Sequence, residues 1–175
     1  MQHELAHTSH FTNAGAIFWG RLGLATLNAE IATGDPWGDE DVFDAGILAI
    51  CESWAEHLEH VYTDRAYGGN TSLFPAGRTW LDEIEELRND SPNHVPIGLH
   101  FDLFDNMLDA NNACDRQGGC GPIIDNVAGF TNGQLFSLLD ANTDDPDIYR
   151  VRILNELLPG SGNMAADIDA LFNSY

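Results

Sequence analysis

The stretch His3-Glu4-Leu5-Ala6-His7 places two histidines four positions apart near the start of a chain of 175 residues. On an α-helix, residues four positions apart share a face, so both imidazoles can bind a single metal ion. Glu4 falls beside this pair, where a general base must lie to take a proton from a metal-bound water. The stretch therefore predicts a helix that carries a metal site with a base next to it.

The spacing of these residues is the HExxH pattern of zinc hydrolases. The longer pattern HExxHxxGxxH, which supplies a third histidine from the same segment, does not fit, because its glycine position is His10 and its last position is Asn13. A third ligand must therefore come from elsewhere in the chain. The alternative is a coincidental match in a plain acidic helical domain, with two solvated histidines at the start of a helix.

The chain is strongly acidic, with 28 Asp and Glu residues against 7 basic residues, all arginines, and a formal net charge of -21. Such a surface repels nucleic acid and anionic membranes, so we expect neither as a partner. It attracts cations, including calcium, and basic peptides; the alternative is a solubility or salt-tolerance feature without a partner. The length and the 43% hydrophobic composition fit one domain with a substantial core.

Three cysteines are too few for a scaffold built on disulfides. Cys114 and Cys120 bracket a glycine-rich turn and can close a small loop in an oxidising compartment. Cys51 lies in an apolar helical run and is expected to be a buried thiol. No run approaches 18 consecutive apolar residues, so no membrane span is predicted.

Apolar residues recur at helical spacing along the chain, and neither an internal repeat nor a β-hairpin stands out. Helices are predicted over residues 3–11, 16–33, 45–66, 78–87, 100–110, 132–141, 147–158 and 164–173. Gly15 and the stretch GDPWG at 34–38 separate the first three helices, and Thr131 is the predicted N-cap of a later one. The helix 100–110 is expected to turn its acidic residues to solvent, namely Asp102, Asp105 and Asp109. The predicted fold is mainly α, with little or no β-sheet.

The predicted helix 45–66 carries the second decisive pattern. Its apolar residues form one face, and Glu52, Glu56 and Glu59 follow at i, i+4 and i+7 along the edge of that face. One of these carboxylates, added to His3 and His7, gives the open three-ligand site that a catalytic zinc needs, with water at the fourth position. The alternative is an ordinary solvated acidic face.

HELAH followed by ESWAE at residues 52–56 resembles the gluzincin metallopeptidases, in which a glutamate on a later helix is the third zinc ligand. The resemblance implies one zinc ion per chain held by His3, His7 and Glu52, with Glu56 hydrogen-bonded to His3 and Glu4 as the general base. The longer fragments HELAHTSHF, ESWAEHLEH and VPIGLHFDLFD resemble secreted bacterial proteins of this type. The implied function is hydrolysis of peptide bonds in a peptide or protein substrate, in the extracellular space or the periplasm.

The chain departs from the gluzincin pattern in its spacing and in what precedes the motif. The separation of His7 and Glu52 is long, so the helix 16–33 must be inserted between the two zinc helices. The sheet that normally precedes the zinc helix, and whose edge strand holds an extended substrate, is not predicted in this chain. Because a ligand at the third residue would lie in a fraying helix end, we expect residues 1–175 to be a single helical domain of a longer protein with an upstream, β-containing part. The alternative is a non-catalytic zinc-binding or structural domain that keeps the same helices.

Four further residues are candidates for a donor that assists the transition state, and each is otherwise a surface or packing residue: Tyr62, Tyr67, His57 and His60. His10, near the end of the motif helix, is expected to be structural. Two acidic loops, 39–41 and 140–144, are weaker candidates for calcium. The second loop lacks the glycine and the final glutamate of an EF-hand, which excludes that motif.

Overall fold

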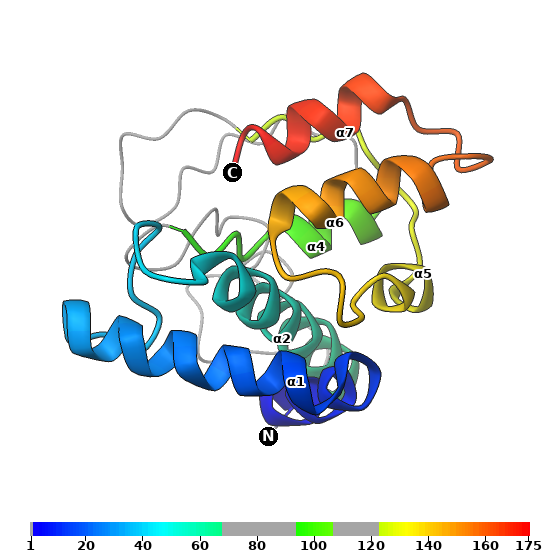
Figure 1. Ribbon diagram of the computed structural model, residues 1–175. Helices are drawn as coiled ribbons and strands as arrows, with labels where there is room; N and C mark the ends of the chain where they lie inside the picture. The colour runs from blue at the N-terminus through cyan, green and yellow to red at the C-terminus, as the bar shows by residue number, and fades with distance from the viewer. Residues whose placement is uncertain (1, 68–93, 107–122) are drawn as a thin grey trace, which may run out of the picture.

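The computed structural model describes residues 2–67, 94–106 and 123–175 of the chain. These residues form helices and loops without a strand, so the mainly α fold predicted from the sequence is confirmed for them (Figure 1). The helices are α1 Gln2–Thr33, α2 Ala45–Tyr67, α4 Leu99–Phe104, α5 Asn132–Ser137, α6 Pro146–Arg152 and α7 Ala165–Phe172, with a π-helical turn at Ile153–Leu157. None of the described helices is long and apolar enough to cross a bilayer. The predicted helix 78–87 and the loop between Cys114 and Cys120 lie outside the described residues.

Helix α1 consists of two halves joined at Gly15, whose backbone angles (φ 81°, ψ 172°) are not helical. Side chains with a Cβ atom are strained at such a positive φ, so a glycine is the residue that permits the turn. The predicted break between the helices 3–11 and 16–33 is therefore confirmed, although the first helix continues up to the glycine. The second half ends at Thr33, where Gly34 (φ 78°) begins the predicted loop.

Helix α1 packs along α2, and both helices contribute to the core. The first half of α1 buries Ala6, His10 and Ala14, and the second half buries Phe18, Leu22, Ala25 and Ala29. From α2 the core receives Ile47, Leu48, Ile50, Cys51, Trp54, Ala55 and Leu58. Cys51 is a buried free thiol, as predicted. The loop after α1 also approaches closely, because a Cβ atom at Gly38 would lie 2.7 Å from Cβ of Ala29.

Helices α4, α6 and α7 lie on the other side of α2 from the second half of α1, with α7 farthest from it (Figure 1). Helix α5 contacts the first half of α1, because Nδ2 of Asn13 donates to the carbonyl of Phe136. Thr131 caps α5 as predicted, since its side chain accepts a hydrogen bond from the backbone N–H of Gln134 in a complete capping box. Helix α5 nevertheless ends at Ser137, earlier than the predicted end of that helix. The guanidinium of Arg21 on α1 bridges to the carboxylates of Asp44 and Asp144 and so links the two sides of the fold.

The prediction of a solvated acidic face on the helix 100–110 is wrong for the two aspartates that the structure describes. Asp102 and Asp105 are 2% and 8% exposed. The hydroxyl of Tyr175 donates to Asp102 over 2.7 Å, and the backbone N–H of Gly129 donates to the carbonyl of Asp105 over 2.7 Å. Other segments of the chain therefore cover this side of α4, which helical spacing alone does not reveal. Asp109 lies outside the described residues.

Candidate metal centre

His3 and His7 on α1 meet Glu52 on α2 at the side of the contact between the two helices. The Nε2 atoms of His3 and His7 lie 3.1 Å apart. Oε2 of Glu52 lies 3.3 Å from Nε2 of His3 and 3.6 Å from Nε2 of His7. The three donor atoms thus form a nearly equilateral triangle, and these side chains are only partly exposed.

The dimensions of this triangle fit a metal ion. Zinc binds nitrogen and carboxylate oxygen at about 2.0–2.2 Å in a tetrahedron, which places neighbouring ligand atoms about 3.3–3.5 Å apart. The observed separations of 3.1, 3.3 and 3.6 Å fall around that value. His3, His7 and Glu52 can therefore hold a metal ion without rearrangement of the two helices.

The sequence positions these donors through simple helix geometry. His3 and His7 project from successive turns of the first half of α1, as their spacing requires. Ala6 on α1 and Ala55 on α2 are both buried in the shared core, and small residues at a contact let two helices approach closely. Glu52 lies just beyond this buried contact, so its carboxylate reaches the edge of α1.

Two further carboxylates surround the other nitrogen of His3. Nδ1 of His3 lies 3.6 Å from Oε1 of Glu56 and 3.4 Å from Oε2 of Glu59. A protonated Nδ1 facing a carboxylate fixes the tautomer and the ring angle of a metal-binding imidazole. Glu56 was expected in this place by resemblance; Glu59, which is nearer, was identified in the sequence only as a member of the acidic row.

The ion pairs set the protonation of the metal-free site. Burial, the largest effect on Glu52, raises the pKa of its carboxyl group, but the hydrogen bonds and charges of His3 and His7 lower that pKa to about 2. The pKa of His3 is raised, first by its hydrogen bond to Glu52, against the opposing effect of burial, and then by the charges of Glu56 and Glu59. Glu52 is therefore an ionised carboxylate across the physiological range, as a metal ligand must be.

Trp19, in the second half of α1, contacts His7. Their ring centroids lie 5.6 Å apart with the planes at 81°, an edge-to-face contact. Nδ1 of His7 is buried and has no hydrogen-bond partner among the described residues. Because Nδ1 of His7 has no hydrogen bond, the contact with Trp19 is what restrains the orientation of the His7 ring. Sequence spacing could not reveal this contact, because it depends on the turn at Gly15.

Glu4 is an exposed residue of α1, one position after His3. Its carbonyl oxygen accepts a hydrogen bond from the hydroxyl of Thr8, while its carboxylate makes no hydrogen bond or ion pair with any described residue. The carboxylate is thus available to solvent, on the turn of α1 that carries His3. Its predicted role as a base stays a prediction.

The other candidates from the sequence differ in accessibility. His57 is wholly buried and its Nε2 lies 2.8 Å from Oδ1 of Asn132, so it is a packing residue without access to a substrate. His60 is also buried, and its Nδ1 donates to the carbonyl of Glu56 one turn earlier. Tyr62 and Tyr67 are exposed on the same helix. His10 is buried against Phe18, Trp19 and Cys51, in the structural role expected for it.

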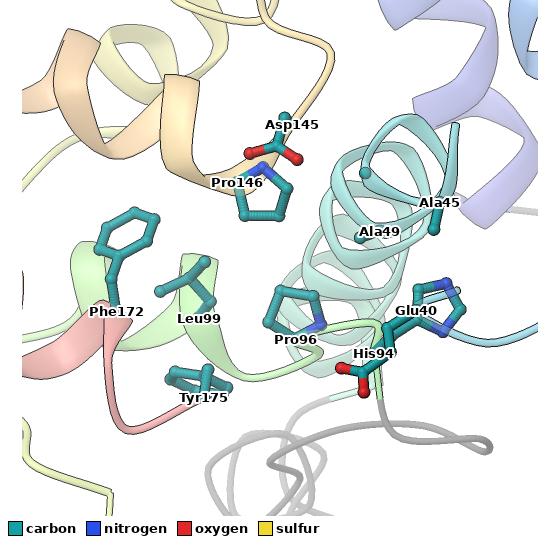
Figure 2. A pocket seen from close by; sticks show the side chains of 11 residues that line it. Glu40, Ala45, Ala49, His94, Pro96, Leu99, Asp145, Pro146, Phe172 and Tyr175 are labelled. Carbon is teal, nitrogen blue, oxygen red and sulfur yellow. The ribbon is translucent and has the colours of Figure 1, made fainter. Parts of the chain in front are cut away.

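Two cavities lie away from the three candidate metal ligands. The larger, of about 280 Å³, lies between the start of α2 and α4, α6 and α7, and has Glu40 and Asp145 with His94 at its polar edge (Figure 2). The other, of about 240 Å³, lies between Trp54 and Tyr62 of α2 and the start of α5. None of His3, His7 and Glu52 lines either cavity.

Within the described part of the chain, the two groups that can hold a metal ion are His3 with His7 and Glu52, and His3 with Glu56 and Glu59. The acidic loops 39–41 and 140–144, which were the candidates for calcium, contribute to neither. Comparisons with protein families, with curated proteins and with solved structures found no match to this chain. The site is therefore defined by its own geometry.

Proposed function

We propose that this protein is a zinc-dependent hydrolase of the gluzincin type, and that it cleaves peptide bonds. One observation carries the proposal: the donor atoms of His3, His7 and Glu52 are spaced as ligands of one tetrahedral ion, at 3.1, 3.3 and 3.6 Å. The spacing HExxH by itself requires only that the two histidines share a helical face. The HExxH spacing does not require that a carboxylate from α2, that of Glu52, also lies at a ligand's distance from both histidines, so this is independent support for a metal site.

The donor set favours zinc over the other common ions. Two imidazole nitrogens and one carboxylate match the three protein ligands of catalytic zinc sites, which leave the fourth position open. Calcium and magnesium require mostly oxygen ligands, six or more for calcium. Glu56 and Glu59 behind His3 add the carboxylate support that zinc-bound histidines commonly have.

Each of these residues has a specific role in the proposed hydrolysis. His3, His7 and Glu52 bind the ion, and Glu56 and Glu59 hold the ring of His3. When bound, zinc supplies Lewis acidity, which lowers the pKa of water and polarises a carbonyl group. Glu4 takes the proton of the attacking water and passes it to the leaving amine. The exposure of the Glu4 carboxylate leaves it free for both transfers.

The substrate would be a peptide or a protein, and the proposed setting is the extracellular space or the periplasm. The acidic surface, with a formal net charge of -21, favours basic segments over nucleic acid or anionic membranes.

The metal content of the purified chain tests the proposal. We expect about one zinc per chain by elemental analysis after exhaustive dialysis, since structural and catalytic zinc sites exchange slowly. The variant Glu52→Gln should lose most of that zinc, because an amide is a poor ligand. The matched control Glu30→Gln removes an exposed carboxylate from α1, outside both groups, and should keep it. Equal zinc in the wild type and in Glu52→Gln would reject the site.

A non-catalytic zinc-binding domain is the second candidate. The observation that favours it is the position of the site, since none of the three proposed metal ligands lines the cavity beside α4, α6 and α7 or the cavity beside Trp54. Peptidase assays separate the candidates, with a library of unstructured peptides as substrates and the metal-loaded chain as the enzyme. Zinc binding without cleavage would select the non-catalytic domain, and cleavage abolished by Glu4→Gln would select the peptidase.

A further inference from the structure

The second half of α1 exposes a line of large apolar side chains on the side facing away from α2. Ile17, Leu24, Leu27 and Ile31 are 86%, 58%, 55% and 75% exposed. We call these four residues the α1 seam. Figure 1 shows this half of α1 along the outer edge of the molecule, with α2 and the other helices on one side only. The largest exposed apolar patch of a soluble protein is often a functional surface.

The spacing of the α1 seam is that of a helix–helix interface. Ile17, Leu24 and Ile31 are seven residues apart, and Leu27 falls between two of them. Ile17, Leu24 and Ile31 fall at a positions of a heptad and Leu27 at a d position, while the earlier d position is Gly20; residues at these positions are the ones by which one helix packs against another. The inner face of the same half is separately buried against α2 through Phe18, Leu22, Ala25 and Ala29. A helix that is apolar on both sides is typical of one with neighbours on both sides.

The charges around the α1 seam exclude a membrane surface or nucleic acid as its partner. Between residues 16 and 33 the charged residues are Arg21 and Glu30. Arg21 is already engaged by Asp44 and Asp144. A helix that lies on a membrane needs free basic residues along its polar side, and none is free here. The surface that covers the α1 seam must therefore be apolar and nearly uncharged.

We infer that the α1 seam is a dimer interface and that its partner is the same face of a second copy of this chain. A two-fold interface requires a self-complementary patch, and Leu24 at the middle of the α1 seam meets the partner's Leu24 whichever way the helices run. Two chains with a formal net charge of -21 can approach most easily through an uncharged face. The four side chains bury on the order of 1,000 Å² in total across both copies, at the lower limit of a specific interface.

The test is the mass of the full chain in solution, measured by sedimentation over about 1 µM to about 1 mM. We expect the wild type to form a dimer within this range and Leu24→Glu to stay monomeric, with Kd raised at least about 100-fold, because two carboxylates would meet at the centre. The matched control is Met164→Glu, which adds the same charge at an apolar residue that is 63% exposed but outside α1. It should dimerise like the wild type.

A charge-swap experiment distinguishes direct contact from a general loss of structure. Leu24→Glu and Leu24→Lys should each be monomeric, while an equimolar mixture should form a mixed dimer through the paired opposite charges. Wild-type dimerisation should strengthen when salt is raised, since screening reduces the repulsion between the acidic copies. A wild type that is monomeric over the whole range, or a Leu24→Glu variant that dimerises as the wild type does, would overturn the inference.

Discussion

Nε2 of His3 lies 3.3 Å from Oε2 of Glu52, and this contact joins the first turns of α1 to the middle of α2. The imidazole holds the carboxyl group ionised, with a pKa of about 2, and the carboxylate in turn raises the pKa of the imidazole. Whenever His3 is protonated, the two groups form an ion pair with their donor atoms at a separation that suits ligands of one metal ion. A bound metal ion would take the place of that proton.

Removal of metal should lower the thermal stability of the wild type. A ligand present at 100 times its Kd stabilises the folded state by about 2.7 kcal/mol, which corresponds to about 5–10 °C in Tm for a chain of this size. We expect EDTA to lower Tm by this amount and added zinc to restore it in differential scanning fluorimetry. Glu52→Gln should respond to neither reagent. A full response of this variant would place the bound zinc elsewhere in the chain.

Replacement of Glu4 should separate metal binding from catalysis. Glu4→Gln keeps the size of the side chain but cannot accept a proton, so we expect zinc content to remain at the wild-type level. The rate of peptide hydrolysis should fall by about 10²–10⁴-fold, the usual contribution of a general base. The readout is kcat/KM on a fluorogenic peptide, with zinc measured on the same sample. Retention of wild-type activity would remove Glu4 from the mechanism.

Glu59 should contribute to metal affinity at least as much as Glu56. The carboxylate of Glu59 lies 3.4 Å from Nδ1 of His3, whereas that of Glu56 lies 3.6 Å away. Loss of such a support commonly weakens metal binding about 10–100-fold. Competition with a chelator of known affinity should show this loss for Glu59→Gln, with Glu30→Gln unchanged. If only Glu56→Gln weakens zinc binding, Glu59 is an ordinary surface carboxylate.

The buried histidines should make the metal-free protein sensitive to acid. Burial lowers the pKa of His10 and that of His57 from 6.5 to about 4. As the pH falls through this range, the unfolded chain takes up protons that the folded chain does not, so stability decreases by up to about 3 kcal/mol for each residue. His3, whose pKa is raised, acts in the opposite direction and offsets part of the loss below pH 6.5.

Urea unfolding of the metal-free chain at several pH values between 7 and about 4 measures this dependence. We expect the midpoint to fall steadily across the range, with a proton uptake on unfolding of about three near pH 5, one each for His10, His57 and His100, because burial lowers all three pKa values, that of His100 well below 6.5. His57→Phe removes one of the titrating groups and should reduce that uptake by about one proton. A midpoint that does not change between pH 7 and 4 would contradict the burial of neutral imidazoles.

Gly15 and Gly23 should respond in opposite ways to alanine. Gly15 has a positive φ of 81°, and a Cβ atom there would meet nothing within 4 Å. An alanine at this position would therefore lose stability through backbone strain and not through a steric clash. We expect Gly15→Ala to lower the free energy of unfolding by about 1–2 kcal/mol. Gly23 lies inside the second half of α1, also with open space around it, so Gly23→Ala should stabilise by about 0.5–1 kcal/mol. Urea denaturation measures both, and a stabilising Gly15→Ala would contradict the observed turn.

Much of the local structure could be predicted because it depends on neighbours in the sequence. The bounds of α2 differ from the predicted helix by one residue, since a single apolar face runs through it. The turn at Gly15 and the cap at Thr131 follow from the backbone preferences of the residues themselves. The spacing of His3 and His7 required that they share a face of α1.

The sequence by itself determined the bounds of α2, the break at Gly15 and the set of residues able to bind a metal, whereas α4 and α5 end earlier than predicted. Only the tertiary structure decided which of those residues meet: that Glu52 closes the triangle with His3 and His7, and that Glu59 approaches His3. It also buried Asp102 and left Ile17 exposed, against the simple assignment of charged residues to solvent and apolar residues to the core. The physical reason is that helical periodicity is a local property, which decides the side of a helix on which a residue lies. Whether that side is buried or exposed depends on long-range packing against the other helices.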